Sequence, residues 1–327
     1  MTTTGPDAPF ALARYRDDGT IRLGLVAGDR IRPLDAADLG ADGGGAADLN
    51  AFLADPDWNH LAALAAEPGP WRPLADVTLT APVEPRHVLQ AGANYRTHVI
   101  QLIMGGLAKK DASASPEEVR AQAERVMDAR AANGRAFIFI GLPGIVVGDD
   151  EPLVLPAYSD THDWELELAI VVGREAFRVS PEEASAHIAG YTIANDVTTR
   201  DLIFPNDLGD IGADWFRSKN APGFLPTGPF LVPAQFVDPA NARVRLELNG
   251  EVMQDASTDE LIYDVPAIVS GASQTTRLLP GDLILTGSPA GNGQHYGRFL
   301  RDGDVMTGSI SHLGTQVVRC VAEDPAP

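Results

Sequence analysis

The sequence has little cysteine and a shortage of basic side chains. Of its 327 residues only Cys320 is a cysteine, so no intrachain disulfide can form and a cysteine-ligated zinc site is excluded. The 45 acidic residues outnumber the 25 basic ones and give a formal net charge of −20. Such a surface repels phosphate backbones and anionic lipid, so we expect neither a nucleic-acid nor a membrane partner.

Long apolar runs are also missing. Nowhere do about eighteen uncharged apolar residues follow one another, as a membrane-spanning helix requires. The first ten residues, MTTTGPDAPF, lack the basic region and apolar stretch of a secretory signal. We therefore expect a cytoplasmic protein.

Glycine and proline are abundant, at 32 and 25 residues, which favours a strand-rich fold with many turns. Residues 9–35 hold three short alternating runs separated by Asp-Gly and Gly-Asp turns, which predicts a small antiparallel sheet. A helix-like stretch follows near 47–66, and the proline-rich segment AEPGPWRPL is typical of a linker. The sequence therefore predicts a small N-terminal domain over residues 1–80 and a larger domain over 81–327.

The larger domain alternates predicted strands with single helices. Ser115 and Pro116 are typical of a helix start within residues 111–133, where a helical lid and an exposed, purely decorative helix are both open interpretations. Further along we expect a strand over 165–172, a hairpin turning at Asn249-Gly250, a helix near 265–277 and a strand at DLILTG. This order indicates an α+β fold with a mixed β core and peripheral helices.

The stretch DWELELAIVVG, residues 163–173, places Glu165 and Glu167 at the start of an otherwise apolar run. In a strand, residues two apart point to one face, so both carboxylates face the same way, either into solvent or toward a metal ion. Asp196 ends the predicted strand YTIAND, where capping of a helix is the ordinary alternative. Three carboxylates suit Mg²⁺, Mn²⁺ or Ca²⁺ better than zinc.

Six blocks in a fixed order carry a family resemblance: GANYRTH, DWELELAIVVG, GYTIANDVTTRD, RSKNAPGFLPTGP, LELNGEVMQDASTDELIYDVPAIV and LLPGDLILTGSPAGNG. The chain resembles the fumarylacetoacetate hydrolase family, and RLGLVAGDRIRPLD resembles the small domain that many members carry. The resemblance implies a β-sandwich roll, a homodimer, and divalent-cation chemistry on 2-oxo acids or β-diketones. It also implies that Glu165, Glu167 and Asp196 are the metal ligands.

The resemblance assigns further roles around that metal. Lys219 would face the oxo-acid group, although a lysine beside Arg217 is more often surface charge, and Arg200 would be catalytic unless it merely pairs with a carboxylate such as Asp201. The substrate-binding positions that match are Tyr95 and the turn formed by Thr286, Gly287 and Ser288. Without the resemblance, this turn would read as an ordinary end of a strand.

His98 matches the family position that activates water, and here the chain departs from the usual pattern. Many members have a glutamate three residues later, whereas this chain has Gln101, whose amide orients a water but cannot accept its proton.

The first hypothesis is a hydrolase that cleaves a C–C bond in an acylpyruvate or related β-diketone. A decarboxylase, hydratase or tautomerase of a 2-oxo acid is the alternative, followed by a non-catalytic binding protein. The change at Gln101, and Ile203 in place of a glutamine that members carry after the arginine, make the site less polar. With Ile100, Leu102, Ile103 and Met104 nearby, they suggest a bulkier or more apolar substrate than fumarylacetoacetate.

Overall fold

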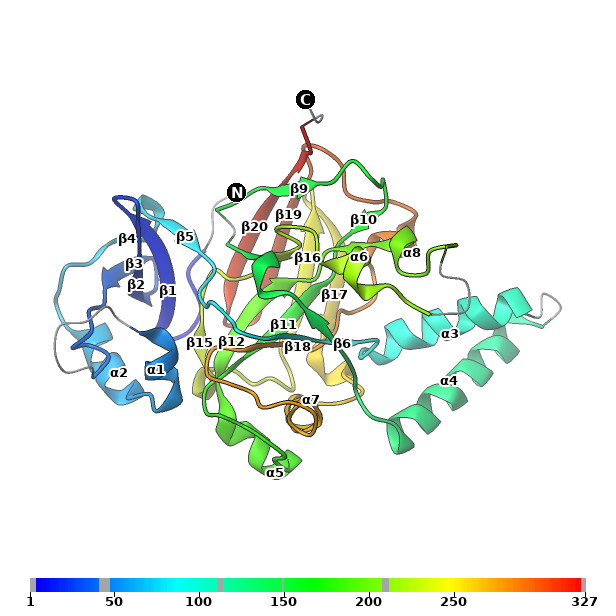
Figure 1. Ribbon diagram of the computed structural model, residues 1–327, viewed down its shortest axis with the longest axis horizontal. Helices are drawn as coiled ribbons and strands as arrows, with labels where there is room; N and C mark the ends of the chain where they lie inside the picture. The colour runs from blue at the N-terminus through cyan, green and yellow to red at the C-terminus, as the bar shows by residue number, and fades with distance from the viewer. Residues whose placement is uncertain (1–3, 41–47, 111–113, 149, 208–211, 325–327) are drawn as a thin grey trace.

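The computed structural model describes residues 4–40, 48–110, 114–148, 150–207 and 212–324. A small sheet with two helices lies at one end of the molecule, a sandwich of two larger sheets lies in the middle, and a helical hairpin projects at the other end (Figure 1). The α+β class with a small β-rich N-terminal region is confirmed.

The N-terminal sheet has the strand order β4-β3-β2-β1-β5. Its strands are β1 Ala11–Asp17, β2 Thr20–Ala27, β3 Arg30–Pro33, β4 Arg72–Pro73 and β5 Thr78–Thr80. Asp18 and Gly19, with φ of 48° and 77°, make the tight turn between β1 and β2 that the Asp-Gly pair predicts. The three predicted strands are confirmed, but β4 pairs with β3, so part of the predicted linker belongs to the sheet.

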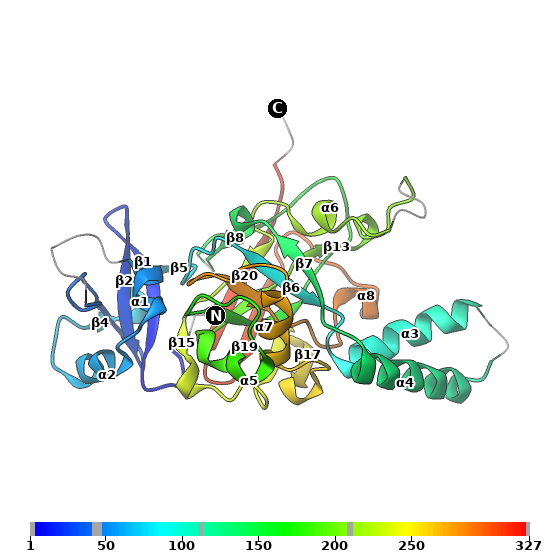
Figure 2. The same cartoon turned by 60° about the horizontal axis from the view of Figure 1, so that its bottom comes forward.

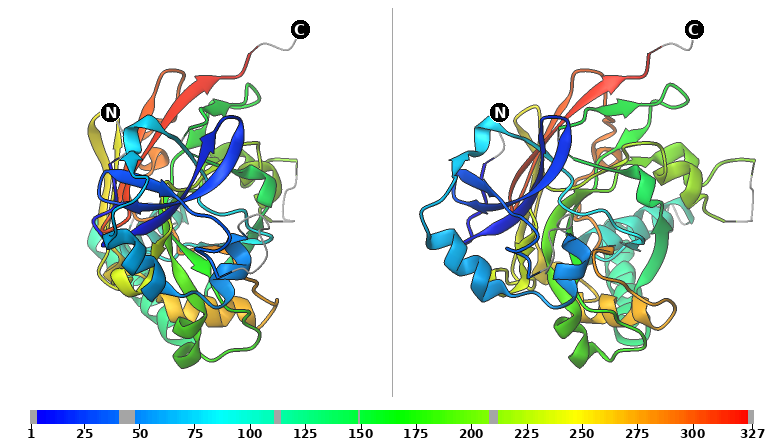
Figure 3. Two further views of the ribbon diagram at one scale, coloured as in Figure 1. Left: turned by 90° about the vertical axis from the view of Figure 1, so that its left-hand side faces the viewer. Right: turned by 60° about the vertical axis from the view of Figure 1, so that its left-hand side comes forward.

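Two helices, α1 Leu49–Ala54 and α2 Trp58–Ala66, replace the single predicted helix near 47–66, of which residue 47 lies outside the described part. Asp48 and Asp57 each accept a hydrogen bond from a backbone N–H in the first turn. Pro56 separates the two helices, because proline disfavours a helical conformation in the residue before it, here Asp55. Asp57 then begins α2. Figure 3 views this end of the molecule from outside.

The sandwich joins a six-stranded sheet to a five-stranded sheet. The six-stranded sheet has the order β15-β12-β11-β18-β6-β7 and consists of β6 Val88–Gly92, β7 Phe137–Gly141, β11 Leu166–Val172, β12 Ile188–Asn195, β15 Val232–Pro233 and β18 Leu283–Leu285. Only the β18–β6 pair among these is parallel. The predicted strands at 165–172 and DLILTG are confirmed to within a few residues.

The five-stranded sheet has the order β17-β16-β19-β20-β9. Its strands are β9 Leu153–Leu155, β16 Arg243–Leu248, β17 Glu251–Ser257, β19 Val305–Ile310 and β20 Gly314–Ala322. Asn249 and Gly250, both with positive φ, form the predicted hairpin turn between β16 and β17. Two short pairs complete the β structure: β8 Val146–Val147 with β14 Leu225–Pro226, and β10 His162–Asp163 with β13 Thr198–Thr199.

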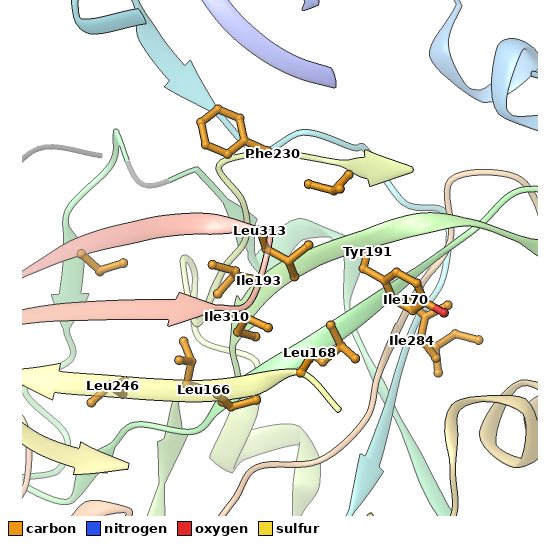
Figure 4. Close-up of a cluster of buried hydrophobic side chains, with 14 of the residues drawn as sticks. Leu166, Leu168, Ile170, Tyr191, Ile193, Phe230, Leu246, Ile284, Ile310 and Leu313 are labelled. Carbon is orange, nitrogen blue, oxygen red and sulfur yellow. The ribbon is translucent and has the colours of Figure 1, made fainter. Parts of the chain in front are cut away.

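The core lies between these two sheets (Figure 4). Leu166, Leu168 and Ile170 alternate along β11 and belong to one cluster with Leu246 of β16 and Ile310 of β19. In Figure 4 Ile170 lies beside Tyr191 and Ile284. Alternation sends the intervening residues of β11 to the opposite face. Along that face Val171 and Ala169 pack in a second apolar cluster that extends to the N-terminal helices, and Glu167 follows them in the same row. One face of β11 thus changes from apolar to acidic along its length.

The helical hairpin consists of α3 Arg96–Lys110 and α4 Pro116–Asn133. Ser115 caps α4 and forms a reciprocal capping box with Glu118, so the predicted start is confirmed, while residues 111–113 of the predicted stretch lie outside the described part. Figure 2 shows both helices projecting from the sandwich. The Tyr263 hydroxyl donates to the Arg130 carbonyl of α4 at 2.9 Å and ties the hairpin to the body. A role as a lid stays a prediction.

The remaining helices are short: α5 Pro181–Ala184, α6 Trp215–Lys219, α7 Val265–Ser273 and α8 Gly293–Tyr296. The helix predicted near 265–277 is α7, which Asp264 caps and which ends at Ser273 rather than near 277. The segment after Asp196, expected to be helical, forms β13 and one 3₁₀ turn because its threonines pair with β10. No helix in the described ranges is long and apolar enough to cross a membrane.

Candidate metal centre

The three predicted acidic residues converge where β11 and β12 meet. The register pairs Leu166 with Asn195, so Glu165 and Asp196 lie side by side just beyond the paired strands. The Asp196 N–H donates to the Glu165 carbonyl at 2.8 Å, and the Glu165 N–H donates to the Asn195 side chain at 2.9 Å. Each acid offers one carboxylate oxygen, and with Glu167 these oxygens lie within 4.8 Å of one another. Their convergence matches the sequence expectation, and their role as ligands stays a prediction.

Lys219 reaches the acids from the last turn of α6. Its ammonium lies 3.0 Å from Oε2 of Glu165 and 2.7 Å from the Thr198 hydroxyl, and it also contacts Asp196. The residue is 2% exposed, so the reading of Lys219 as surface charge is wrong. A helix was not expected there, because the surrounding segment is rich in glycine, aspartate and proline.

Arg200 is the second cation of the centre. Its guanidinium lies 2.6 Å from Oδ2 of Asp163 and 2.7 Å from Oε1 of Glu165. The expected alternative partner, Asp201, instead accepts hydrogen bonds from Ser159 and Thr161. Arg200 therefore does pair with carboxylates, and one of them belongs to the acidic triad.

The pKa values of the three acids are pushed apart. Burial alone would raise the pKa of Glu165, but attraction to Lys219 and Arg200 outweighs it and lowers the value to about 2. Burial raises the pKa of Asp196 to about 6 despite Lys219. Burial and the charges of Asp196 and Glu165 raise the pKa of Glu167 well above its usual value. Like charges held together in this way are favourable when a cation lies among them.

A divalent cation would fit this centre. Four buried or nearly buried carboxylates meet here, those of Asp163, Glu165, Glu167 and Asp196. Among the described residues they pair with two cationic side chains, Arg200 and Lys219, which leaves two net negative charges when all are ionised. Buried charge that is not compensated is costly, so a dication is the natural complement. The donors are hard oxygen ligands of the kind that Mg²⁺, Mn²⁺ and Ca²⁺ prefer.

Two residues beside the acids hold polar atoms without partners. Gln90 is 1% exposed and donates from Nε2 to Oδ1 of Asp196 at 2.6 Å. Its Oε1 and the buried hydroxyl of Tyr95 have no hydrogen-bond partner within the described residues. Burial, followed by the charge of Glu167, raises the pKa of Tyr95, so the hydroxyl stays protonated. A ligand or bound water would satisfy such atoms.

The turn after β18 holds Glu167 in place. The Gly287 N–H donates to Oε2 of Glu167 at 2.6 Å, and the φ of Gly287 is +100°, which favours glycine. Both the N–H and the hydroxyl of Thr286 donate to the Leu168 carbonyl. Ser288 accepts from Gln254 at 2.8 Å. In this structure the donors of the turn bind Glu167 and the Leu168 carbonyl. A role of the turn in receiving a substrate carboxylate stays a prediction.

His98 and Gln101 lie on α3. Burial lowers the pKa of His98, partly opposed by the charge of Glu165, so the imidazole is neutral at pH 7. The effect of Glu165 on this pKa shows that His98 lies near the acidic centre. Gln101 is exposed. Of the apolar residues that follow His98, Ile100 packs against α4 together with Ile103 and Met104. Because they pack between α3 and α4, these three side chains give no support to the expectation of a bulkier or more apolar substrate.

Comparison with known proteins decides the family. The model of the fumarylacetoacetate (FAA) hydrolase C-terminal domain matches residues 87–321, and an Rv2993c-like N-terminal model matches residues 11–82. The chain belongs to the fumarylacetoacetate hydrolase family. The family assignment made from the six sequence blocks is thereby confirmed.

Relatives in this family are enzymes with several activities. The mitochondrial oxaloacetate tautomerase FAHD2A of Bos taurus is 31% identical over 299 residues, covering 86% of this chain and 85% of the relative. Protein Rv2993c of Mycobacterium tuberculosis is 37% identical over 245 residues, 74% and 78% of the two chains. The maleylpyruvate hydrolase of Sphingobium sp. SYK-6, solved with manganese(II) and pyruvate, is 28% identical and has a TM-score of 0.71. The match covers 96% of this chain and 100% of the hydrolase chain.

Three residues of the centre were missed by reasoning from sequence: Gln90, Asp163 and Thr198. Asp163 is buried, accepts the N–H groups of Trp164 and Gly293, and holds Arg200. It precedes the acidic pair in sequence, and its only signal is that proximity. Gln90 gave a clearer signal, because a single amide in the apolar strand VLQAG needs a polar partner when the strand is buried.

Proposed function

We propose that this protein is a divalent-cation-dependent enzyme that forms and stabilises the enolate of a 2-oxo acid. The observation that carries this proposal is the convergence of Glu165, Glu167 and Asp196 beside the buried ammonium of Lys219. When bound to those three carboxylates, Mg²⁺, Mn²⁺ or Ca²⁺ would act as a Lewis acid toward ketone oxygens. The manganese and pyruvate in the maleylpyruvate hydrolase relative support this assignment.

The protein's own residues would divide the remaining work. The three N–H groups of Lys219 contact Glu165, Asp196 and Thr198. One of them would turn to a substrate oxygen that gains negative charge, which would stabilise the enolate more than the ketone. Arg200, fixed by Asp163, holds Glu165 in one orientation. His98 is neutral at pH 7 and can therefore accept a proton. Tyr95 and the turn at Thr286, Gly287 and Ser288 would bind the rest of the substrate.

Cleavage of an acylpyruvate is the first candidate reaction. His98 takes a proton from water while the water oxygen bonds to the distal carbonyl carbon. The bond between that carbon and C3 then breaks, and its electron pair stays on the pyruvate fragment as an enolate that is protonated at C3. The neutral imidazole of His98 supports this reaction, because it is the state that can act as a base.

Keto–enol tautomerisation of a 2-oxo acid such as oxaloacetate is the second candidate. Here His98 would take a proton from C3 and deliver it to the enolate oxygen on C2, or carry out the reverse transfer, and no water has to be activated. The neutral, exposed Gln101 favours this reaction because it cannot share a proton with His98. The 31% identity to oxaloacetate tautomerases points the same way. Decarboxylation and hydration would use the same enolate, and a binding protein would retain only the ligand affinity.

A substrate panel distinguishes these reactions. Acylpyruvates and oxaloacetate are mixed with the protein and Mg²⁺, Mn²⁺ or EDTA, and the loss of enol absorbance, the products and released CO₂ are followed. Glu167→Gln should abolish every cation-dependent reaction, whereas the exposed Glu175→Gln should retain it. Full turnover in EDTA would contradict the proposal, and cation-dependent ligand binding without turnover would indicate a binding protein.

The homodimer and the cytoplasmic location remain proposals. Size-exclusion chromatography with light scattering would give the mass of the particle, and a mass equal to one chain would contradict the dimer. Localisation of a tagged chain would address the compartment.

A further inference from the structure

Three aromatic rings form a cluster at one side of the metal centre. Phe137 and Phe139 come from β7, and Trp215 comes from the first turn of α6; we call these residues the aromatic cluster. The rings of Phe139 and Trp215 stack with centroids 4.8 Å apart and an interplanar angle of 18°. Phe137 lies 5.8 Å from each of them. Figure 2 shows β7 at the edge of its sheet, near α6.

The aromatic cluster lies on the same face of the sheet as the acids. Phe139 pairs with Gln90 across the β6–β7 ladder, and paired residues share a face. Gln90 in turn donates to Asp196. The ring of Phe139 also contacts the ammonium of Lys219, whose Nζ lies 5.4 Å from the ring centroid.

The surrounding chain holds the rings in place without covering them. The Leu142 N–H donates to Oδ1 of Asn220 at 2.7 Å and joins the end of β7 to the end of α6. Gly92 leaves room for the rings, because a Cβ there would lie 3.0 Å from Phe137 and 3.3 Å from Phe139. Yet Phe137 stays 43% exposed, and both Phe139 and Trp215 are only half-buried. Packing between β7 and α6 alone would not need a third, exposed ring.

We propose that the aromatic cluster binds the distal arm of the substrate, and that this arm is planar and apolar, either aromatic or conjugated. The inference rests on the proposed function, because it places the two oxygens of a 2-oxo acid at the acidic triad. The aromatic cluster then selects among 2-oxo acids by the arm beyond those oxygens. Stacked rings bind flat apolar groups through dispersion and quadrupole contacts that an aliphatic or charged arm makes less well.

The direction of the substrate follows from the two sides of the centre. On one side the Gly287 N–H holds Glu167, and the neighbouring turn is the predicted carboxylate end. On the other side the ammonium of Lys219 donates to Glu165 and also contacts the ring of Phe139. Glu165, on the side of the aromatic cluster, is also more exposed than Glu167, on the side of the turn. A 2-oxo acid with its carboxylate at the turn therefore extends its arm toward the aromatic cluster.

Binding of inert probes tests this inference apart from turnover. Calorimetric titrations with Mg²⁺ present compare oxalate, which has no arm, with pyruvate and phenylpyruvate. We expect phenylpyruvate to bind about tenfold more tightly than pyruvate. In Phe139→Leu and Trp215→Leu this preference should fall to about twofold or less, with the oxalate affinity unchanged. The matched control is Phe216→Leu, which removes a neighbouring ring that is 68% exposed and outside the stack, and it should keep the full preference.

The outcomes separate the two proposals. If oxalate binds only with the cation but phenylpyruvate binds no better than pyruvate, the inference about the aromatic cluster is overturned and the proposed function stands. An unchanged preference in both leucine variants would overturn it as well. If oxalate fails to bind in the presence of either Mg²⁺ or Mn²⁺, the proposed function fails first. Retained oxalate affinity in each variant also shows that the variant is folded.

Discussion

Lys219 and Glu165 form a buried ion pair, with Nζ and Oε2 3.0 Å apart, although the two residues lie 54 positions apart in the sequence. Asp196 contacts the same ammonium. Burial favours the neutral form of Lys219, but attraction to Asp196 and Glu165 prevails and raises its pKa. The lysine is therefore charged at any pH at which the enzyme would work, and it organises two of the three acids before a substrate arrives.

Replacing Lys219 by Met should harm both stability and turnover. Removing one partner of a buried pair leaves the other charge uncompensated, at a cost of about 3–5 kcal/mol in the cation-free protein. Mg²⁺ should recover part of that loss, whereas turnover should stay about 10²–10³-fold lower because the enolate loses its donor. Denaturant unfolding in EDTA and in Mg²⁺, together with initial rates, measures both effects. Wild-type rates in this variant would exclude a catalytic role for Lys219.

Gln90→Met should weaken cation binding without removing a ligand. The substitution keeps the shape of the side chain but deletes the donor that holds Oδ1 of Asp196. Loss of a hydrogen bond to a metal ligand lowers metal affinity by about 10–100-fold. Gln316→Met is the matched control, since Gln316 is equally buried but donates to the Pro226 and Gly228 carbonyls. Calorimetry with Mn²⁺ compares the two, and equal affinities would show that Gln90 has no positioning role.

The stabilising effect of Mg²⁺ should depend on pH. Because the folded-state pKa of Asp196 is raised to about 6 and that of Glu167 is also raised, the cation-free fold holds protons that the unfolded chain has released. Its stability therefore falls as the pH rises through about 6. Mg²⁺ binds the deprotonated acids, so at 100 times its dissociation constant it should add about 2.7 kcal/mol at pH 7.5, and much less at pH 5. Thermal unfolding with Mg²⁺ or EDTA at both pH values measures this, and equal Mg²⁺ effects would contradict it.

Tyr263→Phe should loosen the helical hairpin alone. The Tyr263 hydroxyl donates to the Arg130 carbonyl, which the Gly134 N–H also contacts, so the variant loses one hydrogen bond without stranding a buried group. A loss of about 1 kcal/mol would speed amide exchange in α4 about fivefold. Hydrogen exchange read peptide by peptide should show the change in α4 and not in β11 or β12. Unchanged exchange in α4 would show that this bond does not anchor the hairpin.

The sequence was sufficient for those parts of the site that depend on local periodicity. Glu165 and Glu167 share a face because strands alternate, and Ser115, Asp264 and Asn249-Gly250 mark element ends through local hydrogen bonds and backbone conformation. The expected strands and fold class followed from the same patterns.

Long-range pairing decided what the sequence could not. Asp196 reaches Glu165 only because β11 and β12 pair in one register, and the helix after it failed to form because Thr198 and Thr199 pair with β10. Lys219 lies on a five-residue helix, too short for a periodic pattern to predict. The partner of Gln90 lies 106 residues away. Contacts of this kind are set by tertiary packing, which overrides local preference.

The most direct test of the account is a calorimetric titration of EDTA-treated protein with Mg²⁺ and Mn²⁺, repeated on Glu167→Ala and on the exposed control Glu175→Ala. We predict one cation per chain in the parent and in the control, and no measurable binding in Glu167→Ala. Binding that persists undiminished in Glu167→Ala, or no binding to the parent, would contradict the claim that these three acids hold a cation.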